Sequence, residues 1–159
     1  MRCFNQIKSR DNKFMFRINR YSALVALLLL AGNFRLVTAA DDSRQLVQLP
    51  PMMQQHMLSN MRDHLRAINE ILIAMAKDQL DQAADIAEQR LGMSSLQSHG
   101  AGHMAQFMPA AMRMSGTSMH KAASRFALKA QEGDALTAYR SLSEITSSCV
   151  DCHAAYRIR

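Results

Sequence analysis

The apolar residues between Met57 and Met75 recur at intervals that fit one face of an α-helix. Met57, Met61, Leu65, Ile68, Leu72 and Met75 follow one another by four, four, three, four and three positions. Because an α-helix turns once in about 3.6 residues, this spacing places all six side chains on one side. The spacing therefore predicts a helix with this stripe facing a core. Proline is tolerated in a first helical turn, so we expect the helix to begin near Pro51.

Three further helices are predicted in the rest of the chain, because good helix formers dominate and no alternating strand pattern occurs. The second follows Asp78 as N-cap and stops near Gly92, the third starts near Pro109, and the fourth follows Gly133-Asp134 and runs toward Tyr156. We expect the inner side of the fourth helix to carry Leu136, Tyr139, Leu142 and Ile145. Residues 92–108 are the least regular part. The pattern predicts an all-α fold, an antiparallel four-helix bundle over residues 41–159.

The first 40 residues have the character of a secretory signal peptide. A basic stretch ending at Arg20 precedes the apolar run from Ala23 to Ala31, which is too short to span a bilayer. The small residues up to Ala39 and Ala40 predict cleavage there, which would leave no membrane anchor. Met15 is an alternative start that gives a more compact leader. We therefore expect export to the periplasm and a mature chain of residues 41–159.

The charges are divided unevenly between the leader and the rest of the chain. Seven of the 19 Lys and Arg residues, and one of the 13 Asp and Glu residues, lie in residues 1–40. The leader therefore carries the whole formal net charge of +6, and residues 41–159 carry 12 charges of each sign. A balanced body gives no reason to expect a nucleic-acid partner.

The sequence Cys149-Val150-Asp151-Cys152-His153 has the Cys-x-x-Cys-His pattern that attaches c-type haem. Positions i and i+3 share a helix face, so both thiols can meet the vinyl groups of one porphyrin. His153 then supplies the proximal iron ligand. A disulfide would need no His153, a thioredoxin-like dithiol needs a βαβ context, and a zinc site needs a fourth ligand that is not nearby in sequence.

A haem motif at the C-terminus of a helical bundle resembles the cytochrome c-prime family. The resembling stretch runs from Gly133-Asp134 through the motif to Ala155-Tyr156-Arg157. The resemblance implies covalent haem on Cys149 and Cys152, and His153 as axial ligand. It also implies that Arg157, one turn beyond His153, lies beside the haem. Tyr156 is the best candidate for haem contact, because it follows His153 on the same predicted helix. A homodimer through the first two helices is a further implication.

The resemblance leaves the sixth iron position as the feature that decides function. Family members with an apolar distal residue bind gases, and low-spin relatives with methionine transfer electrons. Counting along the first helix gives Met61 as first choice and Met57 as second. A shift of register would place Leu58 there instead and leave iron five-coordinate.

The histidines outside the motif are expected on the surface or in loops. They are His56, His64, His99, His103 and His120. A second metal site stays open between His99 and His103. Copper binding by Met52, Met53, Met57 and Met61 with His56 is another alternative, since thioethers suit copper(I), although methionine at helical spacing more often packs a core.

The sequence therefore predicts a periplasmic mono-haem electron carrier that works with a redox partner protein and is not an enzyme. The alternatives are a five-coordinate cytochrome that binds nitric oxide or carbon monoxide, and a periplasmic copper-binding protein.

Overall fold

The computed structural model describes residues 41–159, and the compact unit comprises Asp42–Arg159. The predicted signal peptide, its cleavage after Ala39 or Ala40 and the alternative start at Met15 lie outside the described residues. None of the described helices is both long enough and apolar enough to cross a membrane.

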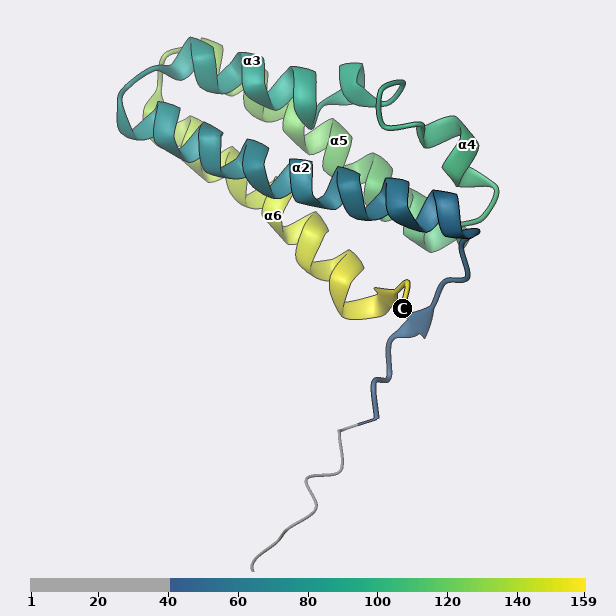
Figure 1. Ribbon diagram of the computed structural model, residues 1–159. Helices are drawn as coiled ribbons and strands as arrows, with labels where there is room; N and C mark the ends of the chain where they lie inside the picture. The colour runs from purple at the N-terminus through teal and green to yellow at the C-terminus, as the bar shows by residue number, and fades with distance from the viewer. Residues whose placement is uncertain (1–40) are drawn as a thin grey trace, which may run out of the picture. The chain divides into compact units, whose positions relative to one another are not determined.

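The described chain is built almost entirely from helices, which confirms the all-α prediction (Figure 1). The long helices are α2 (Pro51–Ala76), α3 (Leu80–Arg90), α5 (Ala110–Gln131) and α6 (Ala135–Ala155). Between α3 and α5 lie a 3-10 turn, η1 (Met93–Ser95), and the short helix α4 (Ala101–Ala105). This intervening segment is the stretch in which the sequence shows least regularity.

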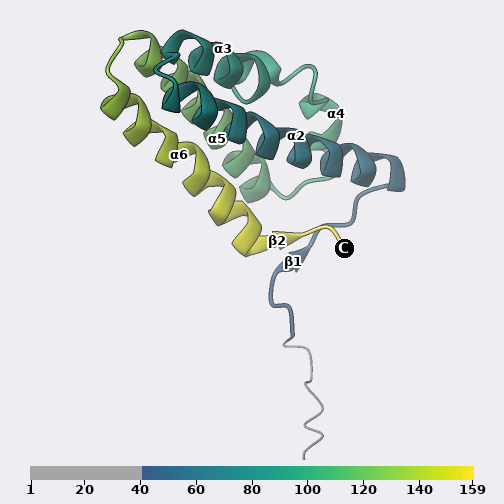
Figure 2. The ribbon, with the colours of Figure 1, turned by 60° about the vertical axis from the view of Figure 1, so that its left-hand side comes forward.

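Two short strands tie together the two ends of the described chain. Strand β1 (Gln45–Leu46) pairs in parallel with β2 (Tyr156–Arg157), with Gln45 opposite Tyr156 (Figure 2). The amide of Val47 continues the contact by donating to the Arg157 carbonyl at 2.7 Å. The expectation that Tyr156 lies on the same helix as His153 is therefore wrong, because α6 ends at Ala155 and the chain becomes extended.

The predicted start and stop signals agree with the structure at most helix ends. Helix α2 begins at Pro51, and α5 begins directly after Pro109. The Asp134 carboxylate caps α6 by accepting hydrogen bonds from the amides of Leu136 and Thr137, and Gly133 before it has φ of +83°. Asp78, predicted to cap the second helix, instead has φ of +58°, and Gln79 occupies the N-cap of α3.

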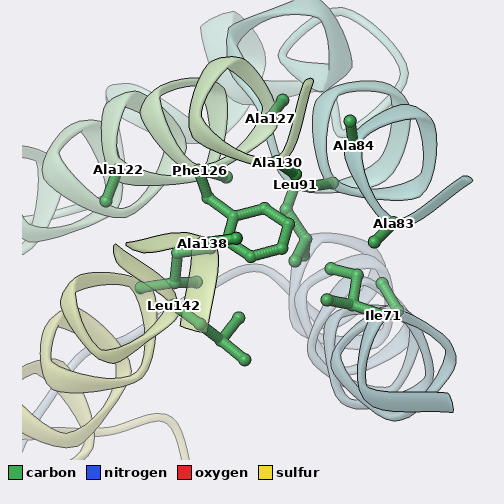
Figure 3. Close-up of a cluster of buried hydrophobic side chains, with 14 of the residues drawn as sticks. Ile71, Ala83, Ala84, Leu91, Ala122, Phe126, Ala127, Ala130, Ala138 and Leu142 are labelled. Carbon is green, nitrogen blue, oxygen red and sulfur yellow. The ribbon is translucent and has the colours of Figure 1, made fainter. Parts of the chain in front are cut away.

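A core of small and large apolar side chains packs where α2, α3, α5 and α6 meet. Phe126 lies at its centre, fully buried among residues from all four helices (Figure 3). Alanines such as Ala83 and Ala87 allow the helices to approach one another closely. The described residues contain a second, smaller cluster of Val47, Met57, Met104 and Met112, which marks the region of the candidate site.

The inner face of α2 differs from the stripe that the sequence predicts. Leu65 and Leu72 are 72% and 42% exposed, whereas His64, Ala67, Ile71 and Ala74 are buried. The cause is that two alanines and a histidine occupy buried positions, and a stripe drawn through large apolar residues misses them. The core side of the helix is thus rotated relative to the prediction.

A similar error affects α6. Leu136 and Tyr139 are exposed, at 59% and 60%, while Ala138, Leu142 and Ile145 are buried. Leu142 and Ile145 were correctly expected inside. Ala138 takes the inner position one turn earlier because α5 and α6 pack closely there.

Candidate functional site

A cavity of about 530 Å³ lies between the first half of α2, residues 96–108, α5 and the end of α6. Thioether side chains make up much of its wall, a feature expected of an adaptable apolar surface. The methionines that line it are Met57, Met61, Met104, Met108, Met112 and Met119.

The predicted attachment motif reaches this cavity at the last turn of α6. Cys152, His153 and Tyr156 all line the cavity, whereas Cys149 packs half-buried against the larger core cluster. Neither thiol is in a disulfide. Burial raises the pKa of both thiols above the ordinary value, so both are protonated near neutral pH.

His153 is exposed where it borders the cavity. Its backbone carbonyl accepts a hydrogen bond from Arg44 Nη1 at 3.4 Å. Within the described residues, its imidazole takes part in no hydrogen bond or ion pair, so both ring nitrogens can serve a ligand. Arg157 is not among the cavity residues, and its Nε atom lies 3.5 Å from Asp42 Oδ2.

The distal-ligand candidates on α2 also line the cavity. Met57 is buried, and Met61 and Leu58 are half-buried. The structure therefore brings the first choice, the second choice and the apolar alternative to the same space. By contrast, Met52 of the predicted copper set is 76% exposed, and His56 Nε2 lies 2.8 Å from the His99 carbonyl oxygen, to which it donates.

Three histidines form a buried cluster where α2, residues 95–99 and α5 meet, and all three line the cavity. They are His64, His99 and His120. His64 and His120 are buried and His99 is half-buried, so the expectation of surface or loop positions is wrong for His64 and His120. His99 does lie between helices, but it points inward. His103 is exposed and does not line the cavity, unlike His99.

The segment that carries His99 is held against α2 by polar contacts. The His99 carbonyl accepts hydrogen bonds from His56 Nε2 at 2.8 Å and from Asn60 Nδ2 at 2.9 Å. Gly100 follows with φ of +63°, and a Cβ there would lie 2.9 Å from His56 Nε2. A larger residue would therefore meet both backbone strain and a clash.

Burial keeps this imidazole cluster neutral. Desolvation, together with the nearby His99 and His120, lowers the pKa of His64 to about 4. Desolvation likewise lowers the pKa values of His99 and His120. The cluster therefore presents uncharged nitrogen atoms near neutral pH.

We expect the protein to lose stability as the pH falls from 6.5 toward 4. His64 binds a proton more readily in the unfolded chain than in the folded one, so acid favours unfolding. Below pH 4 this lowers the free energy of unfolding by up to about 3 kcal/mol. Charged groups that face His64 include Asp63, which opposes the pKa shift, and Arg90, which adds to it. Urea unfolding at several pH values should show a weaker acid loss for His64→Gln than for wild type. The exposed His103→Gln serves as control, and equal pH slopes in wild type and His64→Gln would contradict the account.

Two arginines provide the cationic side chains of the cavity wall. Arg44 forms an ion pair with Asp42 at 2.7 Å, and Arg113 Nη1 donates to the Met108 carbonyl at 2.7 Å. Both side chains belong to exposed residues. They can meet a carboxylate of a molecule that occupies the cavity.

Comparison of the chain with protein-family models finds no match, and no curated protein or solved structure is significantly similar to it.

The residues present fit a covalently attached haem. The cavity is mostly apolar, with a thiol and an imidazole from consecutive positions at one side and arginines for carboxylates. The other thiol, Cys149, lies one helical turn before Cys152, and it is half-buried as Cys152 is. This donor set is the one that c-type haem requires.

Proposed function

We propose that the chain is an exported mono-haem c-type cytochrome that carries electrons. Its four long helices would form an antiparallel four-helix bundle similar to that of the cytochrome c-prime family. The observation that carries the proposal is that Cys152 and His153 of the Cys-x-x-Cys-His motif border a methionine-lined cavity.

Cys149 and Cys152 would hold the group through thioether bonds. Each S–H hydrogen would stay with the group, so attachment at the two vinyl positions would need no leaving group. Burial raises the pKa of both thiols, so each thiol keeps this hydrogen near neutral pH before attachment. Bound haem would supply reversible one-electron chemistry at iron.

His153 and Met61 would hold the iron of the group. The His153 ring has no competing partner among the described residues, and Met61 lines the cavity from α2. Thioether ligation raises the reduction potential. The surrounding methionines exclude water and lower the local dielectric, which also tunes the potential.

Arg44, Arg113 and Tyr156 would position the group. The two guanidinium groups suit its carboxylates, and the half-buried Tyr156 suits its ring edge. Arg157, proposed from the resemblance as a neighbour of the haem, would act only indirectly through its contact with Asp42.

A gas-binding cytochrome is the second candidate, since Leu58 lines the same cavity. If Leu58 faced the iron, no protein ligand would fill the sixth position. A small gas such as nitric oxide or carbon monoxide could then bind there.

The Met61→Ala variant distinguishes these two functions. In the oxidised wild type we expect a low-spin spectrum with a methionine–iron charge-transfer band. Met61→Ala should lose that band, become high-spin and bind carbon monoxide rapidly when reduced. Met57→Ala, the matched control on the same wall, should keep the band. A spectrum of Met61→Ala identical to that of the wild type would exclude Met61 as ligand.

The location and partners of the mature protein follow as further proposals. Export to the periplasm rests on the leader sequence and on the chemistry of c-type haem attachment. The exposed position of His153 near the molecular surface suits electron exchange with a redox partner protein. A homodimer is implied by the family resemblance alone.

A further inference from the structure

Three imidazole rings from separate parts of the chain gather at one place in the cavity wall. The ring centroids are 4.8 Å apart for His64 and His99, 5.6 Å for His99 and His120, and 6.1 Å for His64 and His120. Rings bound to one tetrahedral metal ion have centroids about 5 Å apart. The spacing of His99 from the other two rings is close to this value, whereas His64 and His120 would have to approach each other to share one ion.

The closest pair of ring nitrogens is spaced for a shared ion rather than for a strong hydrogen bond. His64 Nε2 and His99 Nδ1 are 3.5 Å apart. That distance exceeds the usual 2.7–3.2 Å range of N–H donors. Two nitrogen ligands at about 2.0–2.1 Å from a tetrahedral ion lie about 3.3 Å apart.

The third ring is held by a contact typical of metal-binding histidines. His120 Nδ1 donates to the Leu91 carbonyl at 2.7 Å, which leaves Nε2 without a proton and able to bind a metal. Ser95 Oγ lies 3.3 Å from His99 Nδ1 and 3.4 Å from His120 Nδ1, and it donates its own proton to the Gly92 carbonyl. The contact with Leu91 thus fixes the tautomer of His120, and the Ser95 proton is not directed at His99 Nδ1, the nitrogen that faces His64 Nε2.

We propose that His64, His99 and His120 bind one d¹⁰ transition-metal cation, Cu⁺ or Zn²⁺, at a site separate from the haem iron. In the described part of the chain, no three His, Cys, Asp or Glu side chains already converge on one point. Binding therefore includes a rotation of the His120 ring that brings Nε2 toward the pair formed by His64 and His99. Imidazole nitrogen suits both ions.

The charges around the cluster leave the imidazoles as the ligands. Asp63, the nearest carboxylate on α2, is bound by Arg90, with Nη2 to Oδ1 at 2.6 Å. No carboxylate from α2 would therefore neutralise the cation. Its neighbours would include thioethers of the cavity wall, such as that of Met119, which precedes His120 in the sequence. Soft thioethers favour Cu⁺ over Zn²⁺ as the resident ion.

Metal retention by the purified, haem-loaded protein tests the proposal. The protein is first treated with chelator and then dialysed against Zn²⁺, or against Cu⁺ kept reduced with ascorbate in the absence of oxygen. We expect one ion to be retained per chain, with affinity lowered about tenfold or more in His64→Gln and in His120→Gln. The exposed His103→Gln is the matched control and should bind as the wild type does. Retention of only one of the two ions identifies the metal.

Haem content and the iron spectrum, measured on the same samples, separate this inference from the proposed function. The inference does not depend on haem attachment, so absent haem with retained metal would contradict only the proposed function. Failure of wild type to retain either ion would overturn the metal site. Equal retention by wild type and by both folded His→Gln variants, with folding checked by circular dichroism, would also overturn it. A changed iron spectrum in metal-free His64→Gln would overturn it too, by showing His64 to be an iron ligand.

Discussion

Replacing Cys152 with serine is expected to reduce the covalent haem content of the exported protein to near zero. Cys152 is the motif thiol that lines the cavity, immediately before His153. Serine cannot form the thioether, and the half-buried Cys149 beside the main core would remain as the only thiol of the motif. The pyridine haemochrome spectrum of the purified protein measures this loss directly.

Val150→Ala is the matched control for that experiment. Val150 lies between the two cysteines, and its side chain is 65% exposed. Its truncation should leave haem content unchanged. Wild-type haem content in Cys152→Ser would mean that the group is held without this thiol and would contradict the proposed attachment.

Truncating Phe126 to alanine is expected to cost about 3–5 kcal/mol of unfolding free energy. Phe126 is fully buried at the meeting point of α2, α3, α5 and α6 (Figure 3). Its removal leaves a cavity lined by side chains that are themselves held in place. Urea unfolding of the mature protein measures the loss.

Leu128→Ala provides the comparison on the same helix. Leu128 is 63% exposed, so its truncation should change the unfolding free energy by about 0.5 kcal/mol or less. Similar losses in the two variants would show that the core is not centred on Phe126.

Sequence reasoning predicted the helical class and most helix ends because those features depend on local chemistry. Proline before a helix, a glycine at positive φ and an aspartate cap each act within a few residues, as Pro51, Gly133 and Asp134 show. The Cys-x-x-Cys-His motif is local too, and Cys152 and His153 line a cavity, whereas its binding of haem stays a prediction.

The predictions are wrong where tertiary packing determines which face of a helix is buried. Ala67 and Ala74 are buried because α2 packs closely against α3, and alanine gives little signal in a pattern of large apolar residues. Leu65 was expected in the core because leucine is a large apolar residue, but it is exposed. One sequence signal could have identified the buried side of α2. His64, Ala67, Ile71 and Ala74 follow one another by three or four positions, which places them on one face of the helix.

The histidine cluster could not be read from spacing at all. His64 and His120 come from helices far apart in sequence, and His99 lies in the segment without a regular pattern. Their meeting depends on how residues 92–100 fold back onto α2 through His56 and Asn60. The β1–β2 pairing was missed for a similar reason, since strands of two residues carry no periodicity.

The intact mass of the exported wild-type protein tests the central claim most directly. We predict a mature chain that is heavier than the bare polypeptide by the mass of one haem and that keeps this added mass under denaturing conditions. The same sample should show Soret absorption. A denatured mass equal to that of the polypeptide alone, without Soret absorption, would contradict covalent haem attachment at Cys149 and Cys152.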